Sequence, residues 1–292
     1  MEKINHFLKT NLFVSQDELI ASIKKHPEIQ SLVELLNISD QEIWDNFVLF
    51  NDLLSEKRDP SKYLYRTILY RDNNQNLCAR KQINNTKEAK EYLLEHNLAF
   101  SNISRPITKI SIEEQEGINE SNHFDLYNFR SELLEKIDDK DNLKNIKGCY
   151  LEGAANSLRS TVLSNIANSF ALRDYKVAYI NINYLEDELK KGFNSTDNES
   201  NFIVDTLAKI DVLVLDEIGF KNYNPWYIEN ILIKILEQRE LNQKITFLGS
   251  YVSVKNIKSI INNKENKISS FAIEKLQLLI KKLCKLEMWI GK

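Results

Sequence analysis

Apolar residues at helical spacing run through the first part of the chain. Between residues 17 and 36 they recur every three or four positions, which is the spacing of one face of an α-helix. Ser39 is followed three positions later by Glu42, and an apolar stretch comes next. A serine and a glutamate at this spacing are typical of a helix N-terminus. The pattern therefore predicts helices from residue 1 to about residue 58.

The pattern changes between residues 63 and 83. Residues 63–70 are rich in aromatic and β-branched side chains, and the Asp-Asn-Asn sequence at 72–74 is a turn signal, so a small β element is expected. Its tyrosines fit either a docking face or ordinary sheet packing. A charged segment at residues 86–96 then predicts one more helix.

Polar residues predominate in the middle of the chain. Residues 98–124 contain Pro106, Gly117 and many acidic, serine and asparagine residues without a regular apolar period. We expect a linker there. It would join an N-terminal domain at residues 1–97 to a second domain at residues 125–292.

Apolar strands alternate with helical segments throughout the second domain. Such alternation is typical of βαβ units and of a parallel sheet. The expected strands cover residues 148–151, 176–182, 211–216, 244–250 and 286–290, and the expected helices cover residues 125–137, 161–172, 184–191, 226–240 and 270–284. We therefore expect an α/β domain with a parallel sheet, preceded by a smaller and mostly helical domain.

Composition narrows the class of protein. Of the 292 residues, 42% are hydrophobic, which is enough for a buried core, and the formal net charge is -3. Because the chain as a whole is not basic, contact with a nucleic acid would need a local patch. The sequence has neither an apolar run that could span a membrane nor the apolar core of a signal peptide near its start. We expect a cytoplasmic protein.

The three cysteines, Cys78, Cys149 and Cys284, lie far apart and form no C-x-x-C pair. Zinc sites and disulfide frameworks usually show closely spaced cysteines. We expect reduced, structural thiols and no zinc.

A paired acid ends the most apolar of the expected strands. Residues 212–215 are all aliphatic, and Asp216 and Glu217 follow at the edge where open α/β sheets bind ligands. In P-loop ATPases, the first acid of such a pair holds Mg²⁺ and the second polarises the attacking water. Asp216 and Glu217 are therefore the candidate catalytic residues. The alternative is a buried strand that ends in a solvated acidic turn.

A phosphate-binding loop is expected between the strand at 148–151 and the next helix. The P-loop pattern G-x-x-x-x-G-K-[ST] fits Gly153 at its first position and Ser160 at its last. The candidate cofactor-binding residues are Gly153, Asn156, Ser157, Arg159, Ser160 and Thr161, and the candidate metal ligands are Ser160 and Asp216.

Two residues depart from that pattern. Leu158 stands in place of the second glycine, and we expect it to incur a steric cost for a positive φ. Arg159 stands in place of the lysine, so the charge is kept while its reach and geometry change. Arg159 could bind phosphate or lie at a solvated helix start, and both interpretations stay open.

These segments resemble the AAA+ core of bacterial replicative-helicase loaders of the DnaC and DnaI type. Residues 215–219, Leu-Asp-Glu-Ile-Gly, match the L-D-[DE]-[IL]-G pattern of that family in full. The strand at 147–153 and the helix at 162–171 are also similar, as are Trp226 and the Ile- and Leu-rich helix that ends near Arg239. The resemblance implies a three-layer AAA+ P-loop domain. It further implies an N-terminal domain that binds the replicative helicase.

The chain departs from the family at several functional positions besides the loop. Tyr251 stands where the family has an asparagine that senses the γ-phosphate. Residues 275–282 contain lysines but no arginine, where the family has its finger and sensor arginines. Because an arginine finger contributes on the order of 10³–10⁵ in rate, we expect weak or absent ATPase activity. A bound cofactor would be ATP or ADP with Mg²⁺. Cys78 could be a remnant of the zinc cluster found in DnaI-like relatives, but its partners are missing.

Three functions remain open from the sequence. The first is a primosomal, helicase-loader-like protein that binds a hexameric replicative DNA helicase and has weak or no ATPase activity. The second is an active loader in which Arg159 replaces the P-loop lysine. The third is an IstB-like transposition helper that binds DNA, and the net charge of -3 counts against it. A cluster of Lys281, Lys282 and Lys285 fits a contact with single-stranded DNA or a solvated helix face.

Overall fold

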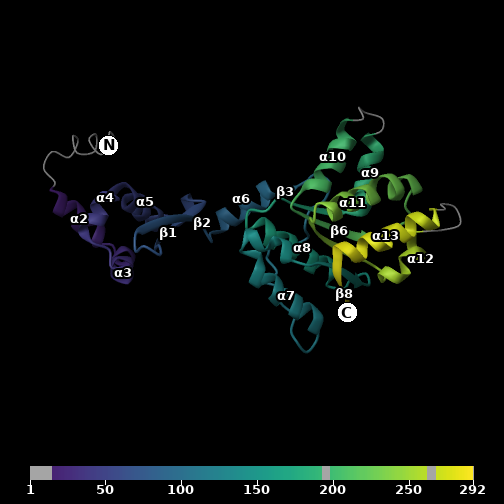
Figure 1. The fold of residues 1–292 in the computed structure, drawn as a ribbon, viewed down its shortest axis with the longest axis horizontal. Helices are drawn as coiled ribbons and strands as arrows, with labels where there is room; N and C mark the ends of the chain where they lie inside the picture. Colours follow the sequence, from purple (N-terminus) through teal and green to yellow (C-terminus); the bar gives the residue numbers. More distant parts are fainter. Residues whose placement is uncertain (1–14, 193–197, 262–267, 292) are drawn as a thin grey trace. The chain divides into compact units, whose positions relative to one another are not determined.

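The computed structural model describes residues 15–192, 198–261 and 268–291. The chain forms two compact units, Met1–Tyr92 and Leu93–Lys292 (Figure 1). Helix α6 (Lys87–Asn97) runs across the boundary between them. Among the described residues, no helix is long and apolar enough to cross a membrane.

The first unit combines short helices with one antiparallel hairpin. Its elements are α2 (Gln16–Lys24), α3 (Pro27–Leu35), α4 (Asp40–Asp45), α5 (Phe47–Arg58), the 3₁₀ turn η1 (Pro60–Lys62), β1 (Tyr65–Arg71) and β2 (Leu77–Ile83). The helix start predicted at Ser39 is confirmed, because Ser39 and Glu42 cap each other's backbone N–H groups. Ile29, Ile43 and Phe50 are fully buried and form the centre of the unit's core.

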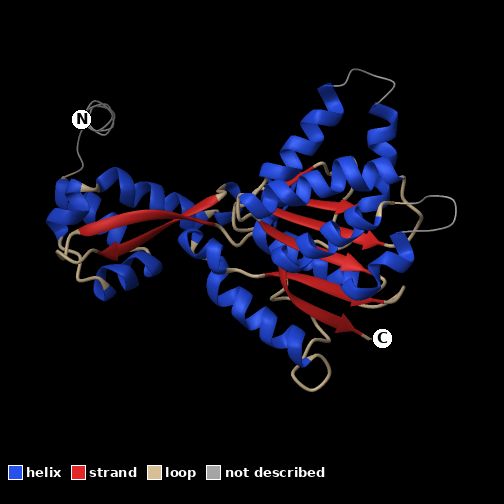
Figure 2. Ribbon diagram, turned by 45° about the vertical axis from the view of Figure 1, so that its right-hand side comes forward, coloured by secondary structure: helices blue, strands red, loops and turns tan. Residues whose placement is uncertain are grey.

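The second unit is built on a six-stranded sheet with the order β3-β5-β6-β7-β4-β8, in which every pairing is parallel (Figure 2). The strands are β3 (Leu98–Ala99), β4 (Gly148–Gly153), β5 (Val177–Asn181), β6 (Val212–Ile218), β7 (Ile245–Ser250) and β8 (Cys284–Ile290). The α-helices are α7 (Phe124–Ile137), α8 (Arg159–Ala171), α9 (Ile182–Gly192), α10 (Asn198–Lys209), α11 (Ile233–Leu241), α12 (Ile257–Ile261) and α13 (Ser270–Leu283). Shorter segments are the 3₁₀ turns η2 (Lys140–Asn145) and η4 (Val254–Asn256) and the π-helical turn η3 (Tyr227–Leu232).

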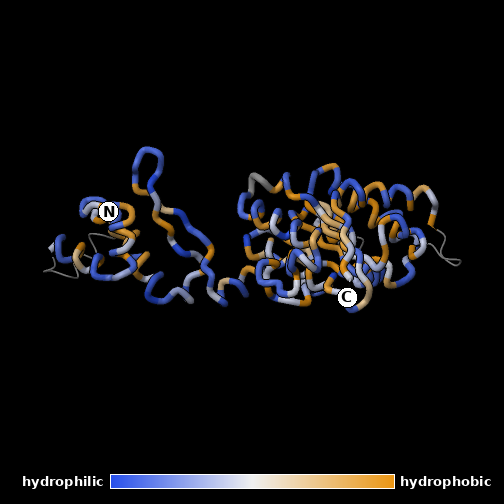
Figure 3. The backbone as a smooth tube through the Cα atoms, turned by 90° about the horizontal axis from the view of Figure 1, so that it is seen from below, coloured by the Kyte–Doolittle hydropathy of each residue, from blue (hydrophilic) through white to orange (hydrophobic). Residues whose placement is uncertain are grey.

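Helices cover both faces of this sheet, so the domain has three layers, as expected (Figure 2). Successive residues of a strand point to opposite faces. Leu151 of β4 accordingly packs into one core with helices α7 and α8, while its neighbour Tyr150 packs into a second core with helices α9 to α13. Both faces are buried, which explains why the strands read as continuous apolar runs; Figure 3 shows this apolar centre.

The predicted linker is the main point at which the fold differs from the expectation. Residues 98–124 belong to the second unit, and β3 adds a strand to the edge of the sheet. The rest of the segment is hydrogen-bonded to one face of α8. Asn168 Nδ2 donates to the carbonyls of Thr108 and Ile110, both at 3.0 Å. Serines of α8 accept backbone N–H groups from the same segment.

Helix α10 is a further difference, because the sequence pattern did not predict a helix there. The arginine at the end of the family-like helix also has a structural role. Arg239 is fully buried and donates to the carbonyls of Leu207, Ile210 and Ile245 at 2.6–2.9 Å. It therefore ties α11 to the ends of α10 and β7 rather than facing a ligand.

Candidate functional site

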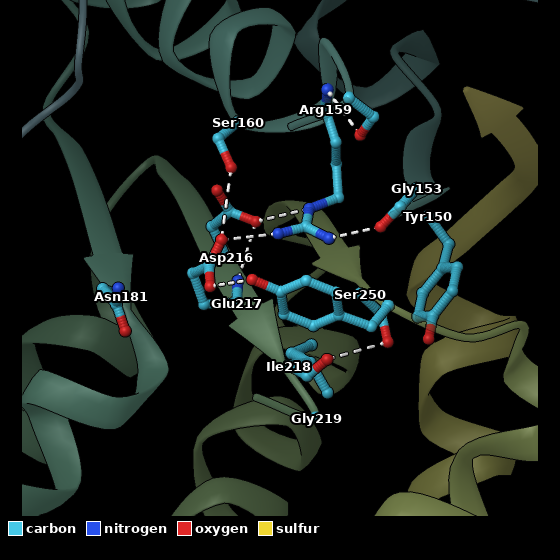
Figure 4. Close-up of polar contacts among 12 residues, drawn as sticks. Tyr150, Gly153, Arg159, Ser160, Asn181, Asp216, Glu217, Ile218, Gly219 and Ser250 are labelled. Carbon is cyan, nitrogen blue, oxygen red and sulfur yellow. Dashed lines mark hydrogen bonds and ion pairs between the residues drawn. The ribbon is translucent and has the colours of Figure 1, made fainter. Parts of the chain in front are cut away.

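The candidate site lies where β4, β6 and β7 end. Because the strands are parallel, their carboxyl ends share one edge of the sheet. β7 lies between β4, which leads into the loop and α8, and β6, which delivers the acidic pair. A side chain at the start of α8 must therefore reach across the end of β7 to meet β6, and Arg159 does so (Figure 4).

Arg159 is 2% exposed and bonds in three directions. Its Nε donates to Asp216 Oδ1 at 3.0 Å, its Nη2 to Glu217 Oε1 at 2.5 Å, and its Nη1 to the carbonyl of Gly153 at 2.6 Å (Figure 4). The ring of Tyr251 lies 4.2 Å from the guanidinium carbon. Burial acts against the charge, but Asp216, Tyr251 and Glu217 outweigh it and raise the pKa of Arg159 above its usual value. We call Arg159, Asp216, Glu217 and Tyr251 the arginine cluster.

One of the two expectations for Arg159, the solvated helix start, is wrong. The side chain is not at a solvated helix start, because it is buried. It bonds the two acids at the end of β6 and, at the same time, the carbonyl of Gly153 at the start of the loop. The guanidinium is thus the internal counter-ion of the two candidate catalytic carboxylates.

Both carboxylate oxygens of Asp216 accept hydrogen bonds in this arrangement. It is 1% exposed, and Oδ1 accepts from Arg159 and from the backbone N–H of Glu217 at 2.7 Å. Oδ2 accepts the hydroxyl of Tyr179 at 2.9 Å. Burial and the neighbouring Asp216 raise the pKa of Tyr179 well above its usual range, so the hydroxyl stays a donor.

Glu217 is held by its side chain and by an unusual backbone conformation. Its Oε1 accepts from Arg159, and Ser160 Oγ lies 3.4 Å away; the Tyr251 hydroxyl donates to Oε2. Its φ is 67°, in the left-handed region that costs a non-glycine residue roughly 1–2 kcal/mol. The register of β6 against β7 also shifts between Leu215 and Ile218. Such irregularities re-aim side chains at sites, and here Glu217 is directed to Arg159 and Tyr251.

The loop before α8 avoids the strain that its sequence predicted. Leu158 has φ -71°, so the expected cost of a positive φ at that residue is wrong. Asn156 takes the left-handed conformation instead, with φ 66°, which asparagine tolerates better than most residues. Gly153 is needed for a different reason. A Cβ there would lie 2.4 Å from Ser157 Oγ and 3.2 Å from Arg159 Cβ.

The remaining candidate residues lie near the arginine cluster but do not converge on one point. Asn156 is exposed, and Ser157, Ser160 and Thr161 are partly exposed at the start of α8. The two candidate metal ligands do not form a magnesium site here, because both Asp216 oxygens are engaged. Among the described residues, no group of three or more His, Cys, Asp and Glu side chains could hold a metal ion. As arranged, Arg159 bonds both carboxylates, so it would have to move before a magnesium–nucleotide pair could use them.

The sequence did not identify two residues that complete the site. Tyr179 lies in an apolar strand, and only its need for a hydrogen-bond partner when buried hinted at a role. Gly249 lies in β7, two residues before Tyr251. A Cβ on Gly249 would lie 2.3 Å from Asp216 Oδ1 and 2.4 Å from Leu163 Cδ1, so the acid can pack over β7 only because this residue is glycine.

The sequence and the fold of the chain were compared with those of known proteins. No protein-family model matches the chain. The replicative helicase loader DnaI of Bacillus subtilis (strain 168) is 27% identical over 112 residues, which are 38% of this chain and 35% of that protein. A crystal structure of DnaI superposes with a TM-score of 0.52 and 20% identity, over 62% of this chain and 90% of that one. Over those 112 residues the chain is similar to a DnaI-type helicase loader, and its second unit has a similar fold.

A primosome component from Streptococcus pyogenes serotype M3, described as putative in its name, has a TM-score of 0.49 and 20% identity over 70% of this chain. The resemblance inferred from residues 215–219 is confirmed, and so is the AAA+ fold of the second unit. The match to the curated loader covers about a third of that protein's length. Against this DnaI-type background, the arginine cluster stands where a P-loop ATPase would hold Mg²⁺ and phosphate.

Proposed function

We propose that this protein is a helicase-loader-like adaptor in DNA replication, which binds a replicative helicase and hydrolyses ATP weakly or not at all. The relation to DnaI supports the loader role. One observation supports the proposed weakness of the ATPase activity. The guanidinium of Arg159 bonds both acids of the site and the carbonyl of the first loop glycine.

The physical cost of opening this cluster explains why a nucleotide would compete poorly. To hold Mg²⁺ through Asp216, the protein would have to remove Arg159 from a carboxylate that is 1% exposed. Removing one partner of a buried ion pair costs about 3–5 kcal/mol when nothing replaces its charge, and the incoming Mg²⁺ would have to offset that loss. A lysine at that position carries one point charge on a flexible stem, whereas arginine forms a fixed fork. The forked guanidinium can bond two carboxylates at once, so Arg159 stabilises the arginine cluster.

Helicase binding is assigned in this proposal to residues 1–97, the N-terminal domain expected from the sequence. The described residues of the first unit have a compact core of their own around Phe50, which fits a module that docks independently of the AAA+ domain. Two tyrosines of its hairpin, Tyr65 and Tyr70, are 41% exposed and available to a partner.

Two measurements on the full-length chain test the proposal. We expect retention of the organism's own replicative helicase on the immobilised protein, and no ATP turnover above background in the same preparation. Helicase retention that is equal with and without ATP would agree with an adaptor. Mg²⁺-dependent hydrolysis that disappears in Glu217→Gln would show an active loader instead, and absence of helicase retention would contradict the loader role itself.

A further inference from the structure

A basic groove lies at the edge of the sheet opposite to the arginine cluster. Its volume is about 930 Å³, and its wall includes the starts of β4 and β7 and the segment where α13 passes into β8. Six lysines line it: Lys136, Lys144, Lys147, Lys244, Lys282 and Lys285. Glu132 and Glu240 are the acidic residues in the lining. We call this feature the lysine groove.

Helix ends explain only part of this lysine cluster. A cation in the last turn of a helix is favoured by the helix dipole, and Lys136 and Lys282 lie in the last turns of α7 and α13. Lys147 precedes β4, Lys244 precedes β7, and Lys285 lies within β8, so none of these three is at an α-helix end. Their gathering in one groove calls for another reason.

The acidic residues do not neutralise the groove. Glu132 is shared between Lys136 at 2.6 Å and Lys147 at 3.7 Å, and Lys282 pairs with Glu240 at 3.0 Å. Lys244 pairs at 3.2 Å with Asp211, which is not part of the lining. Within the described part of the chain, Lys144 and Lys285 make no ion pair. Partly exposed pairs of this kind contribute about 0–1 kcal/mol, so their lysines can turn to a stronger anion at little cost.

The groove's lining indicates which anion would suit it. Lysines are compact charges that neutralise phosphate groups without reading a base. None of the groove's described lining residues is aromatic, so it has no platform on which unpaired bases could stack. A group of single charges without an aromatic platform therefore matches phosphate groups.

We propose that the lysine groove binds the phosphate backbone of a nucleic acid. The expected affinity is sequence-independent and strongly salt-dependent, because each neutralised phosphate releases counter-ions. Since stacking contributes nothing here, a duplex should bind at least as tightly as a single strand of equal length. The proposal does not depend on helicase binding, which is measured separately.

The test is fluorescence anisotropy of a labelled duplex and of its single strand, titrated with the full chain over a salt series. The groove variant is Lys144→Glu/Lys147→Glu/Lys285→Glu. The matched control, Lys209→Glu/Lys255→Glu/Lys258→Glu, changes the net charge equally at exposed lysines that do not line the groove. Lys144→Ala/Lys285→Ala tests the same groove without breaking an ion pair, and thermal unfolding checks that every variant folds.

We expect the groove variant to bind at least about tenfold more weakly and its log–log salt slope to fall by about 2–3, since each phosphate contact contributes about 0.9 on duplex DNA. The control variant should stay close to the wild type. Equal weakening in the two triple variants would overturn the proposal, because it would reduce the effect to net charge. Absence of wild-type binding at low salt would also overturn it, as would a single strand bound far more tightly than the duplex.

Discussion

Arg159 shows how one substitution changes the chemistry of a whole site. In the P-loop pattern, a lysine at this position serves the phosphates. The arginine instead bonds Asp216, Glu217 and a loop carbonyl, and the ring of Tyr251 covers it. The two acids are thus retained as partners of a buried cation. This explains how their sequence pattern can be complete while the loop pattern is not.

At the residue scale, Arg159→Ala should destabilise the second unit by about 3–5 kcal/mol, since it leaves a buried carboxylate unpaired. Arg159→Lys should cost less, because it keeps the charge but loses the fork. Urea unfolding measures both.

A double-mutant cycle tests whether Arg159 stabilises the second unit through Asp216. In an Asp216→Asn background, the loss caused by Arg159→Ala should shrink by about 1–3 kcal/mol, the range of coupling energies between contacting residues. Additive losses would show that Arg159 stabilises the fold by packing alone.

At the scale of elements, polar contacts decide where segments pack. Arg71 of β1 ties the hairpin to the α3–α4 connection: it bonds Glu42 and the carbonyls of Leu36 and Asn37. The Arg71 guanidinium and the Ser39 cap lower the pKa of Glu42 to about 2.

That pKa predicts a pH dependence. A carboxyl whose pKa is depressed in the folded state contributes stability above its unfolded pKa of about 4.5, and the contribution is lost as pH falls through about 2. Glu42→Gln should therefore be less stable than the wild type at pH 7, and the gap should close between pH 4.5 and pH 2. Thermal unfolding at several pH values measures it; a gap that is constant down to pH 2 would exclude the ion pair as its cause.

Residues 98–124 provide a second prediction at this scale. Asn168→Ala should destabilise the second unit by about 1–3 kcal/mol, because it removes the donor of two hydrogen bonds, to the carbonyls of Thr108 and Ile110, each worth about 0.5–1.5 kcal/mol. It should also make the segment more sensitive to limited proteolysis. Asn230→Ala, at an exposed position whose side chain bonds within its own helix, is the control. No difference between the two variants would restore the interpretation of a linker.

The sequence predicted most of the second unit because buried parallel strands read as apolar runs, and β5, β6 and β7 do so. It failed at residues 98–124 because hydrogen bonds from side chains of α8 hold this segment, and such bonds leave no periodic pattern in its sequence. A signal was present in α8, where Ser164, Asn165, Asn168 and Ser169 are uncharged, polar and fully buried. The arginine cluster could not be foreseen either, since it depends on β7 separating β4 from β6.

At the scale of the whole molecule, a DnaI-type AAA+ fold is combined with a closed arginine cluster. The P-loop edge of the sheet is occupied by its own side chains, while the opposite edge carries the lysine groove. Under the function proposed above, the fold serves as a scaffold for partner binding and not for nucleotide turnover.

The most direct test is the thermal unfolding temperature of the wild-type protein with and without Mg²⁺–ATP. A ligand at one hundred times its dissociation constant adds about 2.7 kcal/mol to the stability of the protein that binds it. The account predicts no shift at millimolar Mg²⁺–ATP. A clear rise that requires Mg²⁺ and disappears in Asp216→Asn would show that the nucleotide displaces Arg159, and it would contradict the account.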